Sequence, residues 1–173
     1  RLRFPFFRNE LEEGGEDVTS PSEMLDQDKF DSVADHLVVV DTAIEDGPEG
    51  IVGTYRLIRE DIARAHGGFY TSNEYDISRL VNSGANCLEL GRSCVLEKYR
   101  VKPVIQKLWH GISQYVTDND IGVLFGCGSF TGTTNVEDIS RQLSYLHHFH
   151  RAPEEICPKA LPERYVDMNI HPA

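Results

Sequence analysis

Two neighbouring stretches decide the fold class: Cys87-Leu-Glu-Leu-Gly-Arg-Ser-Cys-Val95 and Pro103-Val-Ile-Gln-Lys-Leu-Trp-His-Gly-Ile112. The first is a short, mainly apolar run and predicts a strand. The second repeats apolar residues at helical spacing through to Val116, with a proline where a first helical turn tolerates one. The next apolar run, Ile121–Cys127, is typical of a buried strand in a parallel pair. Strand, helix and strand in this order predict a crossover unit.

The remaining segments extend this unit to an α/β domain. Runs at 36–41 and 51–58, separated by the turn residues of 45–50, predict an antiparallel hairpin. We expect a short helix near 77–81 and a last helix over 136–149, with no clear strand after it. The opening residues 2–11 have helical spacing, residues 12–29 read as a loop, and residues 59–75 look irregular. The prediction is one domain with a mixed sheet.

Bulk composition excludes several classes of protein. The chain has 173 residues, 40% of them hydrophobic, and a formal net charge of -11, so non-specific nucleic-acid binding is not expected. No apolar run reaches the roughly 18 residues of a membrane span. The four cysteines are widely spaced and fit reduced thiols in the cytoplasm better than disulfides or zinc. We likewise expect no metal at His147-His-Phe-His150.

Glu89 and Arg92 are charged residues inside an apolar strand, which is costly unless they are paired or used. Residues three apart point to opposite faces of a regular strand, but a bulge at Gly91 would turn both toward one cleft. A purely structural ion pair is the alternative.

Further acids precede and follow the hairpin. Asp31, Asp35 and His36 lie where the acidic loop enters its first strand, and Arg56 is a charge in its second strand. The two aspartates are four residues apart, so they would share one face of a helical turn and could hold a substrate ammonium group. A solvated, capping loop explains them equally well.

Two more candidate groups flank the short helix and the decisive strand. Glu74 and Asp76 add carboxylates near the helix at 77–81, which Asp76 could simply cap. Beyond the strand lies a basic turn with Arg100 and Lys102, and the start of the following helix could bind an anion there. The turn lacks the glycines of common phosphate-binding loops, so side chains would contribute more.

One family shows comparable blocks in the same order: the ornithine–acyl-carrier-protein N-acyltransferases of the GCN5-related N-acetyltransferase superfamily. This chain resembles it at 53–57, 69–77, 89–95, 108–112, 124–130 and 143–146, and the opening Leu2-Arg-Phe is similar to the family's first-helix motif. The resemblance implies a three-layer α/β fold with a mixed, largely antiparallel sheet. It also implies that residues 1–173 form a single domain that is clipped at both ends.

The resemblance implies direct transfer of a long-chain fatty acyl group, 3-hydroxylated or not, to the α-amine of ornithine. The donor would be the phosphopantetheine thioester of acyl carrier protein rather than acyl-CoA, because both glycines of the superfamily's CoA-binding turn are missing from 100–105. No tightly bound cofactor is implied, and contact with the inner face of the membrane is left open.

The same resemblance assigns roles to the candidate residues. Glu89 would be the general base, with Arg92 beside it, and Asp31 and Asp35 would hold the acceptor ammonium or position the arginines. For the acyl donor we expect Ser93, Cys94, Val95, Arg100 and Lys102; for the acceptor, the polar residues described above add His36, Arg56, Glu74 and Asp76.

Two other functions stay open. Acyl-homoserine-lactone synthases are more distant relatives with comparable acidic and arginine patterns, so lactone synthesis is one alternative. A non-catalytic module that binds acyl carrier protein is the other.

Overall fold

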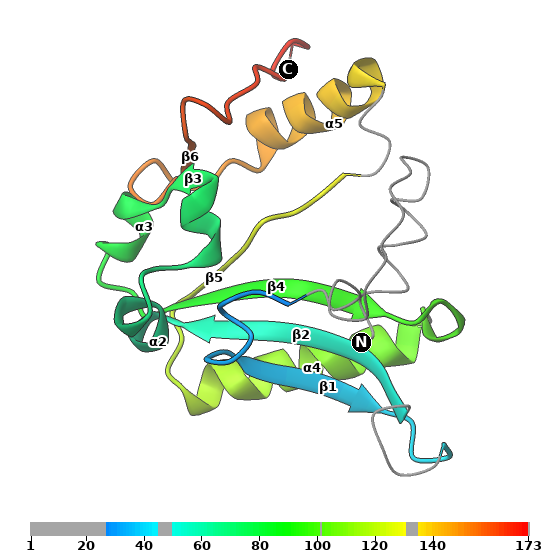
Figure 1. Ribbon diagram of the computed structural model, residues 1–173. Coiled ribbons are helices and arrows are strands. Elements are labelled where there is room, and N and C mark those ends of the chain that lie inside the picture. Colours follow the sequence, from blue (N-terminus) through cyan, green and yellow to red (C-terminus); the bar gives the residue numbers. More distant parts are fainter. Residues whose placement is uncertain (1–26, 45–49, 101, 131–134, 173) are drawn as a thin grey trace, which may run out of the picture.

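The main sheet has a mixed arrangement of strands. The computed structural model describes residues 27–44, 50–100, 102–130 and 135–172. Its strands β1 (Asp35–Val40), β2 (Ile51–Arg59), β4 (Cys87–Val95) and β5 (Val123–Phe125) lie side by side in the order β1-β2-β4-β5 (Figure 1). The first three are antiparallel, and β4 and β5 are parallel. The predicted α/β class and largely antiparallel sheet are confirmed.

Helix α4 (Lys102–Asp118) covers one face of the sheet (Figure 1). Its buried stripe is Val104, Leu108 and Ile112, as the helical spacing predicts. The stripe packs on residues of β2 that alternate toward this face, and Gly53 allows the close approach of Leu108. Ile105 and Trp109, apolar residues of the same helix, lie outside this stripe and are 45% and 51% exposed.

The opposite face carries the apolar core beneath α2 (Glu60–Ala65) and α3 (Ser78–Val81). Ile58 of β2 and Cys87 of β4 point to this side and pack with side chains of both helices and of the preceding loops. The buried residues of this cluster are Phe30, Ile58, Ala63, Phe69, Ile77, Leu80 and Cys87. The sheet therefore separates two apolar layers, and its second face is the one that carries the charged residues described below.

Smaller elements complete the chain. The 3-10 turn η3 (Tyr70–Asn73) leads into β3 (Tyr75–Asp76), which pairs with β6 (Lys159–Ala160). Another 3-10 turn, η4 (Glu97–Tyr99), links β4 to α4. Helix α5 (Val136–Phe149) lies away from the main sheet, beside the C-terminal segment (Figure 1). Ser144 ties the two by donating a hydrogen bond of 3.0 Å to the Met168 carbonyl.

The structure confirms five predicted elements: the hairpin, the helix near 77–81, the strand 87–95, α4 and α5. The strand and α5 have the bounds that the sequence predicts. Three expectations differ. Residues 59–75, expected to be irregular, contain α2 and η3; β5 is shorter than Ile121–Cys127; and β6 follows the last helix. The opening helical motif lies outside the described residues.

β5 separates from β4 after three paired residues. The last pair is Glu89 with Phe125, and Gly126 then passes so close to Leu90 that a Cβ would lie 2.2 Å from the Leu90 carbonyl oxygen. From here the chain diverges from β4 toward α5 (Figure 1). Only glycine permits this close approach, and the separation of the two segments creates the cleft described below.

None of the described helices has the length and apolar character needed to cross a bilayer. All four cysteines are free thiols, as their spacing predicts. No group of three or more metal-ligating side chains gathers among the residues that the structure describes.

Candidate active site

A bulge in β4 redirects Arg92. The ladder pairs Arg56 with Gly91 and then Thr54 with Cys94, so Arg92 and Ser93 both stand opposite the single Tyr55. Arg92 has φ 48°, a left-handed conformation that costs a non-glycine residue roughly 1–2 kcal/mol. Regular alternation would place its side chain on the α4 face. Instead it lies with Glu89 on the opposite face, which confirms the predicted bulge, one residue beyond Gly91.

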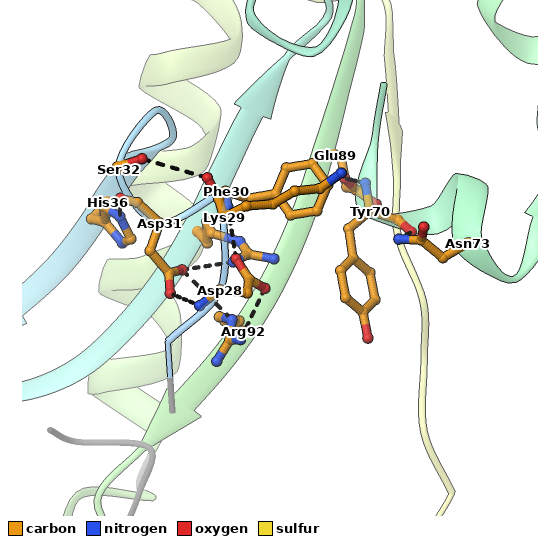
Figure 2. Close-up of polar contacts among 11 residues, drawn as sticks. Asp28, Lys29, Phe30, Asp31, Ser32, His36, Tyr70, Asn73, Glu89 and Arg92 are labelled. Atoms are coloured by element: carbon orange, nitrogen blue, oxygen red, sulfur yellow. Dashed lines mark hydrogen bonds and ion pairs between the residues drawn. The ribbon is translucent and has the colours of Figure 1, made fainter. Parts of the chain in front are cut away.

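Arg92 and Arg56 share two carboxylates. Arg56 Nη1 lies 2.7 Å from Asp28 and 2.6 Å from Asp31, while Arg92 Nη2 lies 2.9 Å from the other Asp28 oxygen. Figure 2 shows both aspartates, from the loop before β1, converging on Arg92. The Arg56 side chain is only 3% exposed, and its guanidinium also lies over the rings of Phe30 and Tyr70. We call these two arginines and two aspartates the ion network.

The ion network keeps Asp28 ionised. Burial alone would raise the pKa of Asp28, but hydrogen bonds from Arg56, Arg92 and the Phe30 N–H outweigh it and lower the pKa to about 2. A carboxyl whose pKa is depressed by folding stabilises the fold at pH values above its unfolded pKa. That contribution is lost as the pH falls through the folded value.

We therefore expect Asp28 to contribute to acid unfolding between about pH 4 and pH 2. Over this range, the stability of the Asp28→Asn variant should fall less steeply than that of the parent, so the gap between the two narrows. Urea unfolding at a series of pH values measures this. Asp118→Asn, at the exposed end of α4, is the control for the substitution itself. A gap that is constant with pH would contradict the assignment.

Glu89 is buried and fully engaged. Its side chain is 2% exposed, and its carboxylate accepts the Tyr70 N–H at 2.8 Å (Figure 2). It also accepts the Thr71 N–H at 2.7 Å. The Thr71 hydroxyl donates a third, short hydrogen bond to the same carboxylate. Glu89 thus holds the first residues of η3 by their backbone N–H groups.

Thr71 also connects Glu89 to Cys127. The Cys127 thiol lies 3.5 Å from the Thr71 hydroxyl oxygen. Burial raises the pKa of Cys127, against the opposing hydrogen bond with Thr71, so this cysteine is a neutral thiol at pH 7. A neutral thiol can donate a proton but is a poor nucleophile. The contacts form a continuous path from the buried carboxylate to the chain that follows β5.

Two cavities meet at the bulge. The first, of about 270 Å³, we call the polar cavity; its charged lining residues are Arg56, Arg92, Glu74 and Glu89. The second, of about 590 Å³, we call the aromatic cavity; it adds Tyr55, Trp109, Leu124 and Phe125. Both are lined by Leu90–Arg92 of β4 and by Cys127–Ser129 after β5. Because Tyr55 and Trp109 belong to the α4 side, the cavities approach the diverging strands from opposite faces of the sheet.

Gly91 lies at this junction. It lines both cavities, and a Cβ at this position would meet no atom within 4 Å. A molecule in the polar cavity and one in the aromatic cavity would therefore face each other across Gly91. The arrangement can bring two reactants together beside a buried carboxylate.

Of the predicted acceptor residues, Asp31, Arg56 and Glu74 lie at the site and Asp35 does not. Asp35 accepts a hydrogen bond from the Tyr115 hydroxyl of α4 and lies 3.7 Å from Arg59. The expected pairing of Asp31 with Asp35 is wrong, because Asp35 begins β1 and its side chain turns toward α4. The partner of Asp31 in the network is Asp28.

His36 and Asp76 have local contacts. The His36 imidazole lies 2.9 Å from the Asp31 carbonyl oxygen, at the edge of the ion network but outside both cavities. Asp76 accepts a hydrogen bond of 2.9 Å from the Ser78 N–H at the start of α3. The capping alternative explains Asp76.

The residues predicted for the acyl donor spread along the end of β4. Ser93 lines the aromatic cavity, whereas Cys94 is buried and pairs with Thr54. Val95 accepts a hydrogen bond of 3.2 Å at its carbonyl from Arg100, which is exposed. Lys102 is the first residue of α4, and its side chain lies outside the described part of the structure.

Sequence reasoning missed Asp28, Thr71 and Cys127. The Asp28-Lys-Phe-Asp31 spacing was a usable signal, since residues three apart share one face of a helical turn as residues four apart do. Thr71 and Cys127 had no signal of their own, because tertiary packing alone brings η3 and the segment after β5 to Glu89.

A profile of the acetyltransferase (GNAT) domain matches residues 2–110, more than half of the sequence. The chain belongs to the GNAT acetyltransferase family. This agrees with the resemblance drawn from its motifs and with the mixed sheet whose parallel strands β4 and β5 diverge at the cleft.

Several curated bacterial proteins are similar to this GNAT chain, each named L-ornithine N(alpha)-acyltransferase. The protein of Rhizobium meliloti (strain 1021) is 45% identical over 85% of this chain and 50% of its own length. That of Brucella abortus (strain 2308) is 43% identical over 99% of the chain and 61% of its own length. That of Rhodobacter capsulatus is 40% identical over 97% and 64%. The chain spans between half and just under two thirds of these relatives.

Proposed function

We propose that this chain is an N-acyltransferase that moves an acyl group from a thioester to the α-amine of ornithine or a closely related amino acid. One observation carries the proposal: two cavities on opposite faces of the sheet meet at Gly91, beside the buried Glu89. Direct transfer needs both reactants in one site, and this junction provides it. The names of the similar proteins support ornithine as acceptor.

In this proposal the polar cavity takes the amino acid and Glu89 removes a proton from its α-ammonium group. At pH 7 most of that amine is protonated and cannot attack. Because Glu89 is enclosed by η3, its proton arrives through the Thr71 hydroxyl or a water molecule in the cavity. The bonds from Tyr70 and Thr71 hold the carboxylate in place for this step.

The aromatic cavity takes the thioester. The amine nitrogen forms a bond to the thioester carbonyl carbon, the tetrahedral intermediate collapses, and the carbon–sulfur bond breaks. The products are an amide and a thiol: the leaving sulfur gains the proton that the attacking nitrogen loses as it becomes the amide, and the proton first taken by Glu89 is released to solvent. We place the carbonyl at the bulge of Arg92 and Ser93, the part of β4 closest to both cavities. Cys94 and Val95, also predicted for the acyl donor, are less suitable positions for the carbonyl, since these residues already pair with β2.

For the donor we propose the phosphopantetheine thioester of acyl carrier protein, carrying a long-chain or 3-hydroxy fatty acyl group. Tyr55 and Trp109 supply an apolar wall for the arm. The exposed Arg100 and the neighbouring Lys102 would meet its phosphate or the acidic carrier. The missing glycines of the usual CoA-binding turn favour the carrier protein over CoA.

Mass spectrometry of reaction products tests the proposal. The chain is mixed with long-chain acyl carrier protein and a panel of amino acids, and N-acylornithine is the expected product. Acyl-CoA replaces the carrier in a parallel reaction and should give less product. S-adenosylmethionine as acceptor tests for lactone synthesis. Carrier binding without any acylated amino acid would overturn the proposal and favour the non-catalytic module.

A further inference from the structure

The charges around the polar cavity do not cancel. Arg56 and Arg92 are matched by Asp28 and Asp31 through the ion network. Glu74 and Glu89 also line the cavity, and neither forms an ion pair with a described residue. The cavity therefore presents two carboxylates beyond those that balance its arginines, and a ligand with two positive groups would complement it.

The Glu74 carboxylate can bind a ligand, whereas the Glu89 carboxylate is already engaged in hydrogen bonds within the protein. The Glu89 carboxylate already accepts three hydrogen bonds from η3. Glu74 directly follows η3; its N–H donates to the Thr71 carbonyl at 3.0 Å and its carbonyl accepts the Leu161 N–H at 2.9 Å. These backbone bonds fix the residue, while its half-buried carboxylate has no hydrogen-bond partner among the described residues.

The other end of the cavity suits a carboxylate. Arg92 lines it with a side chain that is 16% exposed, and Arg56 Nε is buried without a hydrogen-bond partner in the described structure. A buried, unsatisfied N–H beside a cavity is costly unless a ligand or water contributes there. Guanidinium groups pair well with planar carboxylates. The polar cavity, of about 270 Å³, is thus lined by Arg56 and Arg92, which suit a ligand carboxylate, and by Glu74, which suits a ligand cation.

We propose that Glu74 binds the side-chain ammonium group of the acceptor and so restricts this site to amino acids with two amines. This rests on the proposed function and assigns each group of the acceptor to a residue. The α-carboxylate lies at Arg92 and Arg56, the α-amine faces Glu89 and Gly91, and the second amine reaches Glu74. Asp31, the earlier candidate for the ammonium, is occupied by the arginines.

Equilibrium binding, without acyl donor, tests this directly. Calorimetric titration of the full chain compares ornithine with norvaline, the same amino acid without the side-chain amine. We expect the parent to bind ornithine about 10–100-fold more tightly, the range of one charge-assisted contact. Glu74→Gln should remove this preference and leave norvaline binding unchanged. Asp76→Asn, two residues along and still able to cap α3, is the control and should keep the preference.

The kinetic counterpart uses kcat/KM for the same two acceptors. Glu74→Gln should lower the value for ornithine by a similar factor, and the value for norvaline should stay the same. Equal losses for both acceptors, or an unchanged ornithine preference in either measurement, would overturn the assignment of Glu74. If the parent binds ornithine through Glu74 yet forms no acylated product, the proposed transfer fails while this inference stands.

Discussion

Acyl transfer by the Glu89→Gln variant is expected to be about 10²–10⁴-fold slower than by the parent chain, the range that general-base catalysis contributes. Glutamine cannot take the proton from the α-ammonium group, so the fraction of amine that can attack stays small. The measurement is kcat with saturating ornithine and acyl carrier protein. This variant also tests a structural role, since Glu89 accepts the Tyr70 and Thr71 N–H groups.

The two roles are separated by Glu60. Glu60 is a second buried carboxylate that accepts a backbone N–H, from Cys87 at 3.1 Å, but it lines neither cavity at the bulge. Glu60→Gln should therefore cost stability while transfer is retained. Glu89→Asp, with a shorter carboxylate, should recover part of the activity. A folded Glu89→Gln variant with a kcat within about threefold of the parent would remove Glu89 from the mechanism.

The strands of the main sheet could be predicted because the sequence pattern of each one lies within a single element. The β-branched hairpin, the 87–95 strand and the α4 stripe each follow from alternation or helical spacing within one element. Residues 59–75 misled because α2 and η3 are too short to show a period. The pairing of β3 with β6 joins Tyr75 to Ala160 and Asp76 to Lys159, far apart in the sequence, and no local pattern encodes it.

The candidate site was partly predictable for the same reason. A charge in a buried strand is visible in the sequence, so Glu89, Arg92 and Arg56 could be selected. Residues three apart in a regular strand lie on opposite faces, so a bulge had to be assumed for Glu89 and Arg92 to share one face. Which aspartate meets the arginines depends on the path of the loop before β1, and both spacings looked possible. Thr71 and Cys127 come to Glu89 only through the packing of η3 and the divergence of β5.

Replacing Arg56 by methionine is expected to destabilise the fold by about 3–5 kcal/mol, because it leaves Asp28 and Asp31 partly buried with one cation fewer. Methionine has similar length and keeps the apolar contact with Phe30 and Tyr70, so the loss reports the charge. For a chain of this size the melting temperature should fall by about 10 °C. Thermal unfolding followed by circular dichroism measures it.

Arg141→Met on α5 is the matched surface control, since Arg141 pairs with Glu137 at 3.1 Å but its side chain is 67% exposed. An exposed pair of this kind contributes about 0.3–0.5 kcal/mol. Adding Asp31→Asn to Arg56→Met should restore much of the lost stability, because Arg92 and Asp28 then remain as a balanced ion pair at 2.9 Å. That recovery would distinguish an unbalanced charge from a packing defect; a double variant no more stable than Arg56→Met alone would contradict the role assigned to the ion network.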